Sequence, residues 1–489
     1  MRMLRGTAYL AAAEVVFVIS GWVIHVGSKH ILGLADYGTF GILLSLLTLY
    51  RIFLATGVNR AVSREISRRP DRDRSIRRGA LRLQLALGLG LGLAIWLAAP
   101  GLAEIWSDRH FTGYIRLTAF FLPAFGLYSV YRGVLNGHTL FGAEARVSII
   151  YSGLKVLFVF LLIALFTALG RDRIFGAVGG YLAAIAGAIV IARVLCPPAG
   201  GGPGDGFPLG RIAAFAFPVV LFSFILSLVQ HLDLYFVRAL LADDPEAAGL
   251  YTCAQQFARI PYMLLYALSL TIFPVVAART AAPGGEAAAG AAVRRALRGG
   301  LLAVLPLAAL IGATAGPLLG LVYGPDSAAG GAALEILIFG QTLLALLLVL
   351  ATVITAGGRP WLSFSLVGAA LALSALFNHL WVPAYGIRGA AIATTLAAGL
   401  GAAAAGMIVL KFFGALLPPA AAGKIVFASA VVFALGRWWS PAGWLLPPAL
   451  AALAGVYLLV LYALREITPG DGRMILSLFR KPPPSQPSI

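Results

Sequence analysis

Six charged side chains interrupt apolar runs of the sequence that are otherwise long enough to cross a membrane: Glu14, Arg51, Arg132, Lys155, Asp233 and Arg259. A charge at bilayer depth costs roughly 2.5–3.5 kcal/mol on insertion scales, so such a residue is a functional candidate by default. Four bases against two acids favour an anionic ligand. Arginine in particular offers a planar fork that meets phosphate oxygens bidentately and keeps its charge at any relevant pH.

Helical spacing joins these charges to further small or polar side chains. At about 100° per residue, two stripes of aligned residues run along residues 6–28 and 249–277, namely Thr7, Glu14, Gly21, His25 and Ser28, then Thr252, Gln255, Arg259, Tyr262 and Tyr266. A lipid-facing surface would not carry these groups, which leaves packing against other helices or a water-filled cavity. We predict a substrate-binding and translocation cavity that contains Glu14, His25, Arg51, Arg132, Lys155, Gln255, Arg259, Tyr262 and Tyr266.

Glu14 and Asp233 are acids within apolar runs, which makes them candidates for coupling transport to an energy source. Glu14 and Arg51 both lie roughly 10–13 Å deep from the same side of the membrane, at 1.5 Å per residue. Two interpretations of Glu14 stay open. It exchanges a proton during the transport cycle, or it is a fixed counter-ion joined to Arg51 by a salt bridge.

Composition indicates which elements position these residues. Of the 489 residues, 60% are hydrophobic and 11% are charged, with a mean hydropathy of +0.91, whereas ordinary globular domains carry about 25% charged residues. A soluble enzyme and a disordered chain are therefore excluded. The two cysteines make no metal or disulfide motif, and we expect neither a metal nor a cofactor. The predicted fold is an all-α polytopic membrane protein with fourteen transmembrane spans, at residues 6–28, 37–59, 81–101, 114–136, 148–169, 175–195, 212–236, 249–277, 300–323, 331–356, 361–382, 387–411, 421–438 and 444–464.

Charge placement orients the chain. With the N-terminus in the cytoplasm, cytoplasmic segments hold 25 of the Lys and Arg residues and external segments hold eight. This asymmetry predicts that both termini are cytoplasmic. The largest basic cluster, from Arg60 to Arg82, has nine arginines. We interpret it as a topology determinant at the anionic inner leaflet, with attraction of an anionic lipid headgroup as the alternative. Because the basic residues fit this pattern, the net charge of +18 does not indicate a nucleic-acid partner.

A repeat within the chain predicts its domain organisation. Residues 174–184 (IFGAVGGYLAA) are similar to residues 387–397 (IRGAAIATTLA) at an offset of 213. Six spans per half relate the halves by an axis along the membrane normal, a common transporter design with the site between the halves. We expect an N-terminal six-helix lobe at 1–196, a Gly/Pro-rich cytoplasmic linker at 197–211, a C-terminal six-helix lobe at 212–413, an extra helix pair at 414–465 and a cytoplasmic tail at 466–489 that is disordered at its end.

Three stretches of the N-terminal lobe carry a family resemblance: residues 4–7 (LRGT), 31–41 (ILGLADYGTFG) and 57–65 (GVNRAVSRE), with a weaker echo at 247–251 (AAGLY). They resemble the opening of polysaccharide flippases of the multidrug/oligosaccharidyl-lipid/polysaccharide (MOP) exporter superfamily. Fourteen spans also resemble the lipid II flippase branch, in which a helix pair follows two six-helix lobes. The resemblance implies a V-shaped, two-lobed fold whose central cavity opens alternately to each side. It also implies a polyprenyl-pyrophosphate-linked glycan as cargo.

The charges and the resemblance together predict a flippase, not an enzyme. It moves a polyprenyl-pyrophosphate-linked oligosaccharide from the inner to the outer leaflet of the bacterial cytoplasmic membrane by alternating access. The alternatives are a lipid II flippase and a drug/cation antiporter of the same fold, although an antiporter would favour acids in its cavity. A membrane glycosyltransferase would need carboxylates on a long external loop, which the sequence lacks. Expected partners are the lipid-linked glycan, membrane lipids, and glycosyltransferases or a polysaccharide polymerase.

Overall fold

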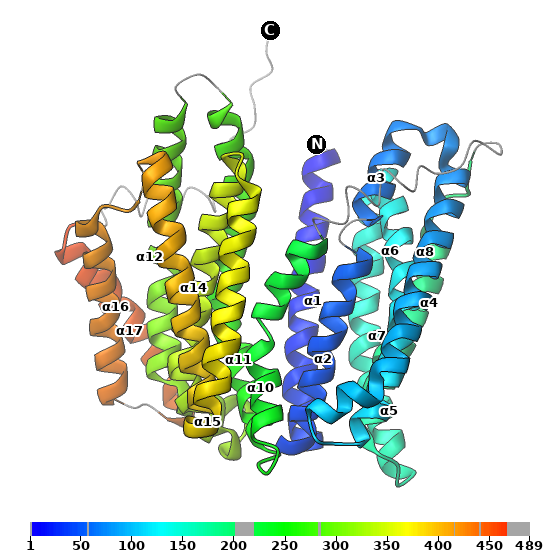
Figure 1. Cartoon of the computed structure of the whole chain (residues 1–489), viewed down its shortest axis with the longest axis horizontal. Coiled ribbons are helices and arrows are strands. Elements are labelled where there is room, and N and C mark those ends of the chain that lie inside the picture. The colour runs from blue at the N-terminus through cyan, green and yellow to red at the C-terminus, as the bar shows by residue number, and fades with distance from the viewer. Residues whose placement is uncertain are drawn as a thin grey trace. The chain divides into compact units, whose positions relative to one another are not determined.

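The computed structural model describes residues 2–55, 58–200, 220–281, 285–414, 416–439 and 442–466. Within them the chain is helical and has no strand (Figure 1), which confirms the predicted all-α fold class. Two compact units are present: unit 1 comprises Met1–Thr252 and Leu371–Ala393, and unit 2 comprises Cys253–Ala370 and Thr394–Ile489. Most of the predicted linker, from residue 201, and the predicted tail after residue 466 lie outside the described residues.

Nine labelled helices lie entirely within unit 1: α1 (Arg2–Leu32), α2 (Leu34–Ala55), α3 (Val58–Arg68), α4 (Asp73–Ile105), α5 (His110–Ala119), α6 (Phe121–Gly137), α7 (Phe141–Ala168), α8 (Arg173–Leu195) and α10 (Leu232–Leu240). Gly33, with φ +81°, separates α1 from α2. Other glycines bring helices together: a Cβ on Gly180 of α8 would lie 2.5 Å from the Cα of Val159 on α7. Small residues at such interfaces are typical of helix packing in membranes.

α3 extends from the end of the predicted span 37–59 into the basic cluster that precedes the predicted span 81–101. Its residues Val58, Val62 and Ile66 are buried in a cluster with Val130 and Val134 of α6. Spacing of four places these apolar side chains on one face of the helix. The arginines between them lower the mean hydropathy of the segment, so a search for long apolar runs misses the helix.

The number of spans differs from the sequence prediction. Eleven helices among the described residues are long and apolar enough to cross a membrane, or twelve if Val220–Val229 and Leu232–Leu240, bent by 47°, form one span. The count of fourteen is therefore not confirmed. The predicted span 114–136 is divided between α5 and α6 at Phe120. The predicted spans 361–382 and 387–411 both lie in α15 (Pro360–Phe413), where Gly386 adopts a non-helical φ of 58° that glycine tolerates without strain.

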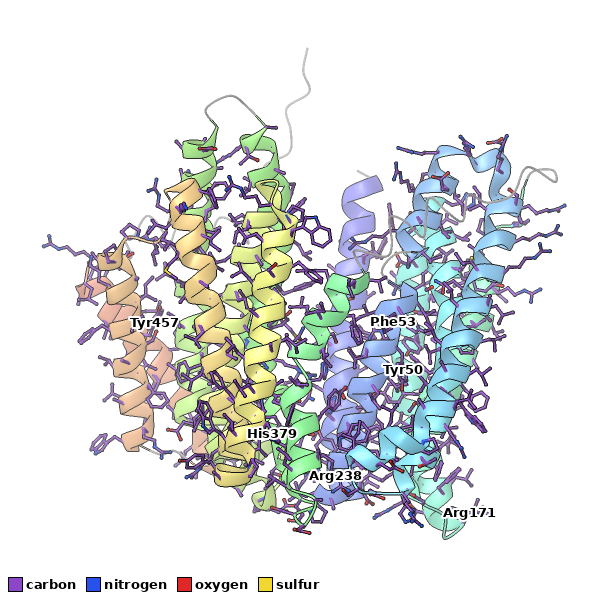
Figure 2. The ribbon with its side chains drawn as sticks, viewed as in Figure 1. Tyr50, Phe53, Arg171, Arg238, His379 and Tyr457 are labelled. Atoms are coloured by element: carbon purple, nitrogen blue, oxygen red, sulfur yellow. The ribbon has the colours of Figure 1, made fainter. Side chains whose placement is uncertain are left out.

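Unit 2 contains most of α11 (Ala247–Thr280), with α12 (Glu286–Ala313), α13 (Ala315–Tyr323), α14 (Gly331–Ala356), both ends of α15, α16 (Pro419–Trp439) and α17 (Leu446–Ala463). The last two helices form the predicted C-terminal pair. Val432 and Ala428 of α16 are buried against Leu453 and Tyr457 of α17. Tyr457, labelled in Figure 2, donates a hydrogen bond of 3.1 Å to the Leu302 carbonyl of α12, so the pair is fixed to this unit.

Glycines of the family-like motif and of its echo pack against each other within unit 1. A Cβ on Gly38 of α2 would lie 2.5 Å from the backbone nitrogen of Gly249 in the first turn of α11. This contact brings the motif and its echo together within unit 1, and the internal repeat stays a prediction. The lobe boundaries stay a prediction, because unit 1 continues to Thr252 instead of ending at the predicted linker.

Candidate functional site

Arg51 of α2 is held by aromatic rings. Its Cζ lies 5.5 Å from the ring centroid of Phe17 on α1 and 5.4 Å from that of Phe125 on α6. Its Nε is buried and makes no hydrogen bond within the described part of the chain. Ring faces attract a cation through their quadrupole without occupying its N–H donors. The rings therefore hold the guanidinium in place without using its N–H donors.

Lys155 of α7 contacts the Phe17 ring as well. Its Nζ is 3.9 Å from the Phe17 centroid and 5.3 Å from that of Tyr151, and the residue is only 4% exposed. Phe17 therefore contacts two cations from two different helices. Both Arg51 and Glu14 act electrostatically on Lys155, which places all three charges in one neighbourhood, as the matching depths in the sequence predict.

Arg132 of α6 completes the group but is already paired. Its Nη2 lies 2.6 Å from Oε1 of Glu144 on α7, and its Nε donates to the same oxygen at 3.1 Å. Its Cζ lies 5.8 Å from the Tyr128 ring. Glu144 is 3% exposed, so it neutralises Arg132 inside the protein. Glu144 lies between the predicted spans 114–136 and 148–169, so the search for charges within spans does not find this partner.

Glu14 of α1 is exposed and contributes to the electrostatics of both Arg132 and Lys155. The salt bridge from Glu14 to Arg51, one of the two interpretations of the sequence, is not formed among the described residues. Arg51 is directed to the rings of Phe17 and Phe125 instead. We call Glu14, Arg51, Arg132, Glu144 and Lys155 the cationic cluster; its three bases and two acids leave one net positive charge.

α11 carries the predicted residues of unit 2. Gln255 and Tyr262 are buried, Arg259 is half-buried and Tyr266 is exposed. The rings of Tyr262 and Tyr266 stack with centroids 6.3 Å apart and an angle of 13° between their planes, and the charge of Arg259 acts on Tyr262. The stripe thus presents a stacked tyrosine pair one helical turn from an arginine, as its spacing predicts.

His25 and Asp233 each belong to a separate polar pair. The His25 Nδ1 lies 2.9 Å from the Tyr37 hydroxyl. Asp233, fully buried, accepts a hydrogen bond of 2.7 Å from the Tyr251 hydroxyl. Asp233 lies in the first turn of α10, just after the 47° bend. The bend lies within the predicted span 212–236, of which residues 212–219 lie outside the described residues.

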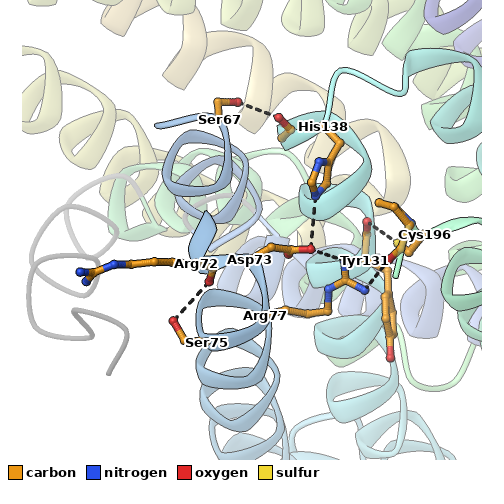
Figure 3. A network of polar contacts seen from close by, with 10 residues as sticks. Ser67, Arg72, Asp73, Ser75, Arg77, Tyr131, His138 and Cys196 are labelled. Carbon is orange, nitrogen blue, oxygen red and sulfur yellow. Dashed lines mark hydrogen bonds and ion pairs between the residues drawn. The ribbon is translucent and has the colours of Figure 1, made fainter. Parts of the chain in front are cut away.

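A second polar network connects α4 to α6 and to the segment after α8. Figure 3 shows Asp73 between Arg77 and His138, whose nitrogens lie 2.8 and 3.3 Å from its Oδ2. Arg77 also donates to the Pro197 carbonyl at 3.1 Å. Beside them, burial raises the pKa of the Cys196 thiol to about 11. These contacts attach the start of the predicted linker to unit 1, and we assign them a structural role.

The described residues contain no group of three or more His, Cys, Asp or Glu side chains that could hold a metal ion. The chemistry of the cationic cluster is instead that of an anion site. Arg51 and Lys155 supply positive charge, and the rings of Phe17, Tyr128 and Tyr151 supply flat apolar faces.

Comparisons with known proteins agree with this chemistry. The model of the polysaccharide biosynthesis protein family matches residues 3–278, more than half of the chain. No curated protein matches the sequence. Among solved structures, the lipid II flippase MurJ in an inward closed conformation is similar with a TM-score of 0.72 at 12% identity, over 98% of this chain and 100% of that chain. An inward-facing multidrug resistance transporter of the MATE family, from the MOP superfamily, is similar with a TM-score of 0.64 at 17% identity, over 83% of this chain and 98% of that chain.

Proposed function

Because the chain belongs to the polysaccharide biosynthesis protein family, a family of transporters and flippases and not of enzymes, we propose that it flips a polyprenyl-pyrophosphate-linked oligosaccharide across the membrane by alternating access. Its fold is that of MOP-superfamily transporters, which agrees with the resemblance seen in residues 4–65. The many apolar helices identify it as a multi-pass membrane protein.

The cationic cluster is the observation that carries the proposal. A pyrophosphate bears two or more negative charges, and Arg51 can meet its oxygens with a planar fork of donors. Lys155 adds a second cation, and this cation contacts the same Phe17 ring as Arg51. An antiporter for cationic drugs would favour a site dominated by acids, whereas bases outnumber acids here.

We further propose that the predicted residues of α11 serve the same cargo. Arg259 supplies another cation, and the stacked faces of Tyr262 and Tyr266 suit sugar rings. His25, Gln255 and Asp233 are proposed as polar groups of the pathway.

Transport by purified protein in proteoliposomes tests the proposal. A fluorescent polyprenyl-pyrophosphate oligosaccharide is loaded, and its appearance in the second leaflet is measured with an impermeant quencher. Removing one charge-assisted contact typically costs about 1.5–3 kcal/mol, so Arg51→Ala should weaken cargo binding by roughly ten- to a hundredfold. Arg171→Ala, which removes an exposed arginine on a loop, is the matched control. Transport of wild-type rate by a folded Arg51→Ala, Lys155→Ala variant would contradict the proposal.

Lipid II is the second candidate cargo. The similarity to the lipid II flippase covers 98% of this chain, including the α16–α17 pair, whereas the MATE-family similarity covers 83%. Both cargoes share a polyprenyl pyrophosphate and differ in the glycan. Competition of the two lipids in one proteoliposome assay separates them, because only the preferred glycan should reduce transport of the other at equal concentration.

The proposed orientation places both termini in the cytoplasm of a bacterium, with transport from the inner to the outer leaflet. Its support is the concentration of Lys and Arg in alternate loops. Single cysteines at Asp71 and Arg109, both exposed in the structure, test it with an impermeant thiol reagent on intact cells. The reagent should label position 109 and spare position 71, and the reverse result would invert the topology.

A further inference from the structure

The exposed side of α4 carries a ladder of arginines. Arg74, Arg78 and Arg82 follow each other at intervals of four residues, and all three are exposed. Their guanidinium groups form no ion pair or hydrogen bond with other described residues. Like charges four residues apart on a helix repel and destabilise it. Such a ladder is therefore expected to be stabilised by an anion that lies along it.

The same face of α4 continues as apolar surface. Leu89, Leu93 and Leu97 are 55%, 59% and 63% exposed, and at about 100° per residue they lie within roughly 60° of Arg82 around the helix. Leu93 is about 16 Å from Arg82 along the axis at 1.5 Å per residue. A helix face that changes from arginine to exposed leucine places its arginines at the level of lipid headgroups.

A groove opens beside this face, where α4 packs on α5 and α6. Two glycines of α4 allow a close approach of the helices there: a Cβ on Gly88 would lie 2.6 Å from the Cα of Pro123, and one on Gly92 would lie 3.1 Å from the Ala119 carbonyl oxygen. The groove has a volume of about 330 Å³ and is apolar, with a lining of Gly88, Leu89, Gly92, Leu93, Trp96, Ala119, Phe120 and Pro123. It begins about 9 Å below Arg82 along the helix axis.

We propose that this side of α4 is a binding site for a diacyl phospholipid with an anionic headgroup. The phosphate lies against Arg78 and Arg82, and one acyl chain follows the helix into the groove as far as Trp96. Charge complementarity selects an anionic headgroup over a zwitterionic one, and the groove selects a lipid over a free phosphate. The site lies on α4, α5 and α6 and uses no residue of the cationic cluster, so it is a site for a resident lipid in addition to the cargo.

Native mass spectrometry of the full-length protein tests the headgroup contact. Purified protein is titrated with phosphatidylglycerol or with phosphatidylcholine of the same acyl chains. Phosphatidylglycerol should bind in preference, and the Arg78→Ala, Arg82→Ala variant should lose affinity for it by roughly tenfold or more, as expected for two charge-assisted contacts. The matched control is Arg60→Ala, Arg64→Ala, which removes two exposed arginines four residues apart on α3. An equal loss in both variants would show general attraction to a basic surface and would overturn the site.

A second pair of variants tests the groove without changing charge. Leu93→Trp fills the groove and should lower phosphatidylglycerol binding severalfold, whereas Leu97→Trp, on the same face outside the lining, should not. Binding of glycerol phosphate with the affinity of phosphatidylglycerol, or unchanged binding in Leu93→Trp, would overturn the acyl contact. Displacement of phosphatidylglycerol by an equal concentration of polyprenyl phosphate would assign the surface to cargo and overturn a resident lipid.

Discussion

Phe17 should couple the two cations of the proposed pyrophosphate site, and Phe17→Leu measures that coupling. The substitution keeps an apolar side chain but removes the ring that lies 3.9 Å from the Lys155 Nζ and 5.5 Å from the Arg51 Cζ. Cation–π contacts contribute about 0.5–1 kcal/mol at exposed sites and about 2 kcal/mol when desolvated. Lys155 is 4% exposed, so its contact belongs at the upper end of this range. The longer contact of half-buried Arg51 belongs near the lower end.

A double-mutant cycle separates this coupling from the simple loss of packing. Unfolding in detergent is measured for wild type, Phe17→Leu, Lys155→Met and the double variant. Phe17→Leu alone also leaves a cavity, whose cost appears in both arms of the cycle and cancels. We expect a coupling free energy of about 1–2 kcal/mol. Cargo affinity, measured in parallel, should fall in Phe17→Leu, because both cations lose the surface that holds them in position.

The matched control replaces Phe53 of α2, labelled in Figure 2, whose ring packs on Phe224 at 5.0 Å between centroids. Phe53→Leu removes an aromatic contact of the same unit, yet no cation contact of Phe53 is recorded among the described residues. Its cycle with Lys155→Met should give a coupling near zero. A coupling for Phe17 below about 0.3 kcal/mol, within the additivity of independent sites, would refute the idea that the ring positions the cations.

Three further predictions concern single groups. Glu144→Gln keeps the shape of the side chain but leaves Arg132 without its counter-charge. Because Arg132 is partly exposed, we expect the free energy of unfolding to fall by about 1–3 kcal/mol. An unchanged melting temperature would contradict the pairing. Glu14→Gln should abolish dependence of transport on the pH gradient if Glu14 exchanges a proton, or lower cargo affinity if it is a counter-ion; wild-type behaviour in both measurements would exclude it from the mechanism. Burial raises the pKa of Cys196 from 9.0 to about 11. At neutral pH its thiolate fraction, and with it the rate of maleimide labelling, should therefore be about a hundredfold lower than in the denatured chain and should rise as the pH approaches 11. Rapid labelling of the native protein at pH 7.5 in a Cys253→Ala background would contradict this.

The charges were visible in the sequence, because a charge in an apolar run is conspicuous at any position. Arg51 and Lys155 come from different helices, and their equal depth predicted that they lie close together, whereas their role in a site stays a prediction. The aromatic partners were not found in this way. Phe17 is one of many apolar residues of its span, and only packing reveals that its ring faces two cations.

Glu144 and α3 were missed for a related reason. Hydropathy begins the fifth span at residue 148, whereas α7 begins at Phe141 and carries Glu144 in its first turn. The spacing of Val58, Val62 and Ile66 was the available signal for α3. α3 is polar on one side and buried on the other, which a search for wholly apolar runs does not detect.

The two arginines of the cationic cluster solve the same desolvation problem differently. Glu144 accepts from two nitrogens of Arg132 and so uses donors that a ligand would need. Arg51 is stabilised by Phe17 and Phe125 through its face, which leaves its edge unoccupied. A transporter must bind its cargo and also release it, and an anion site with one net positive charge binds a pyrophosphate less tightly than one with three. We therefore propose that Arg51 and Lys155 recognise the phosphate, while the Arg132–Glu144 pair holds α6 and α7 in register beside them.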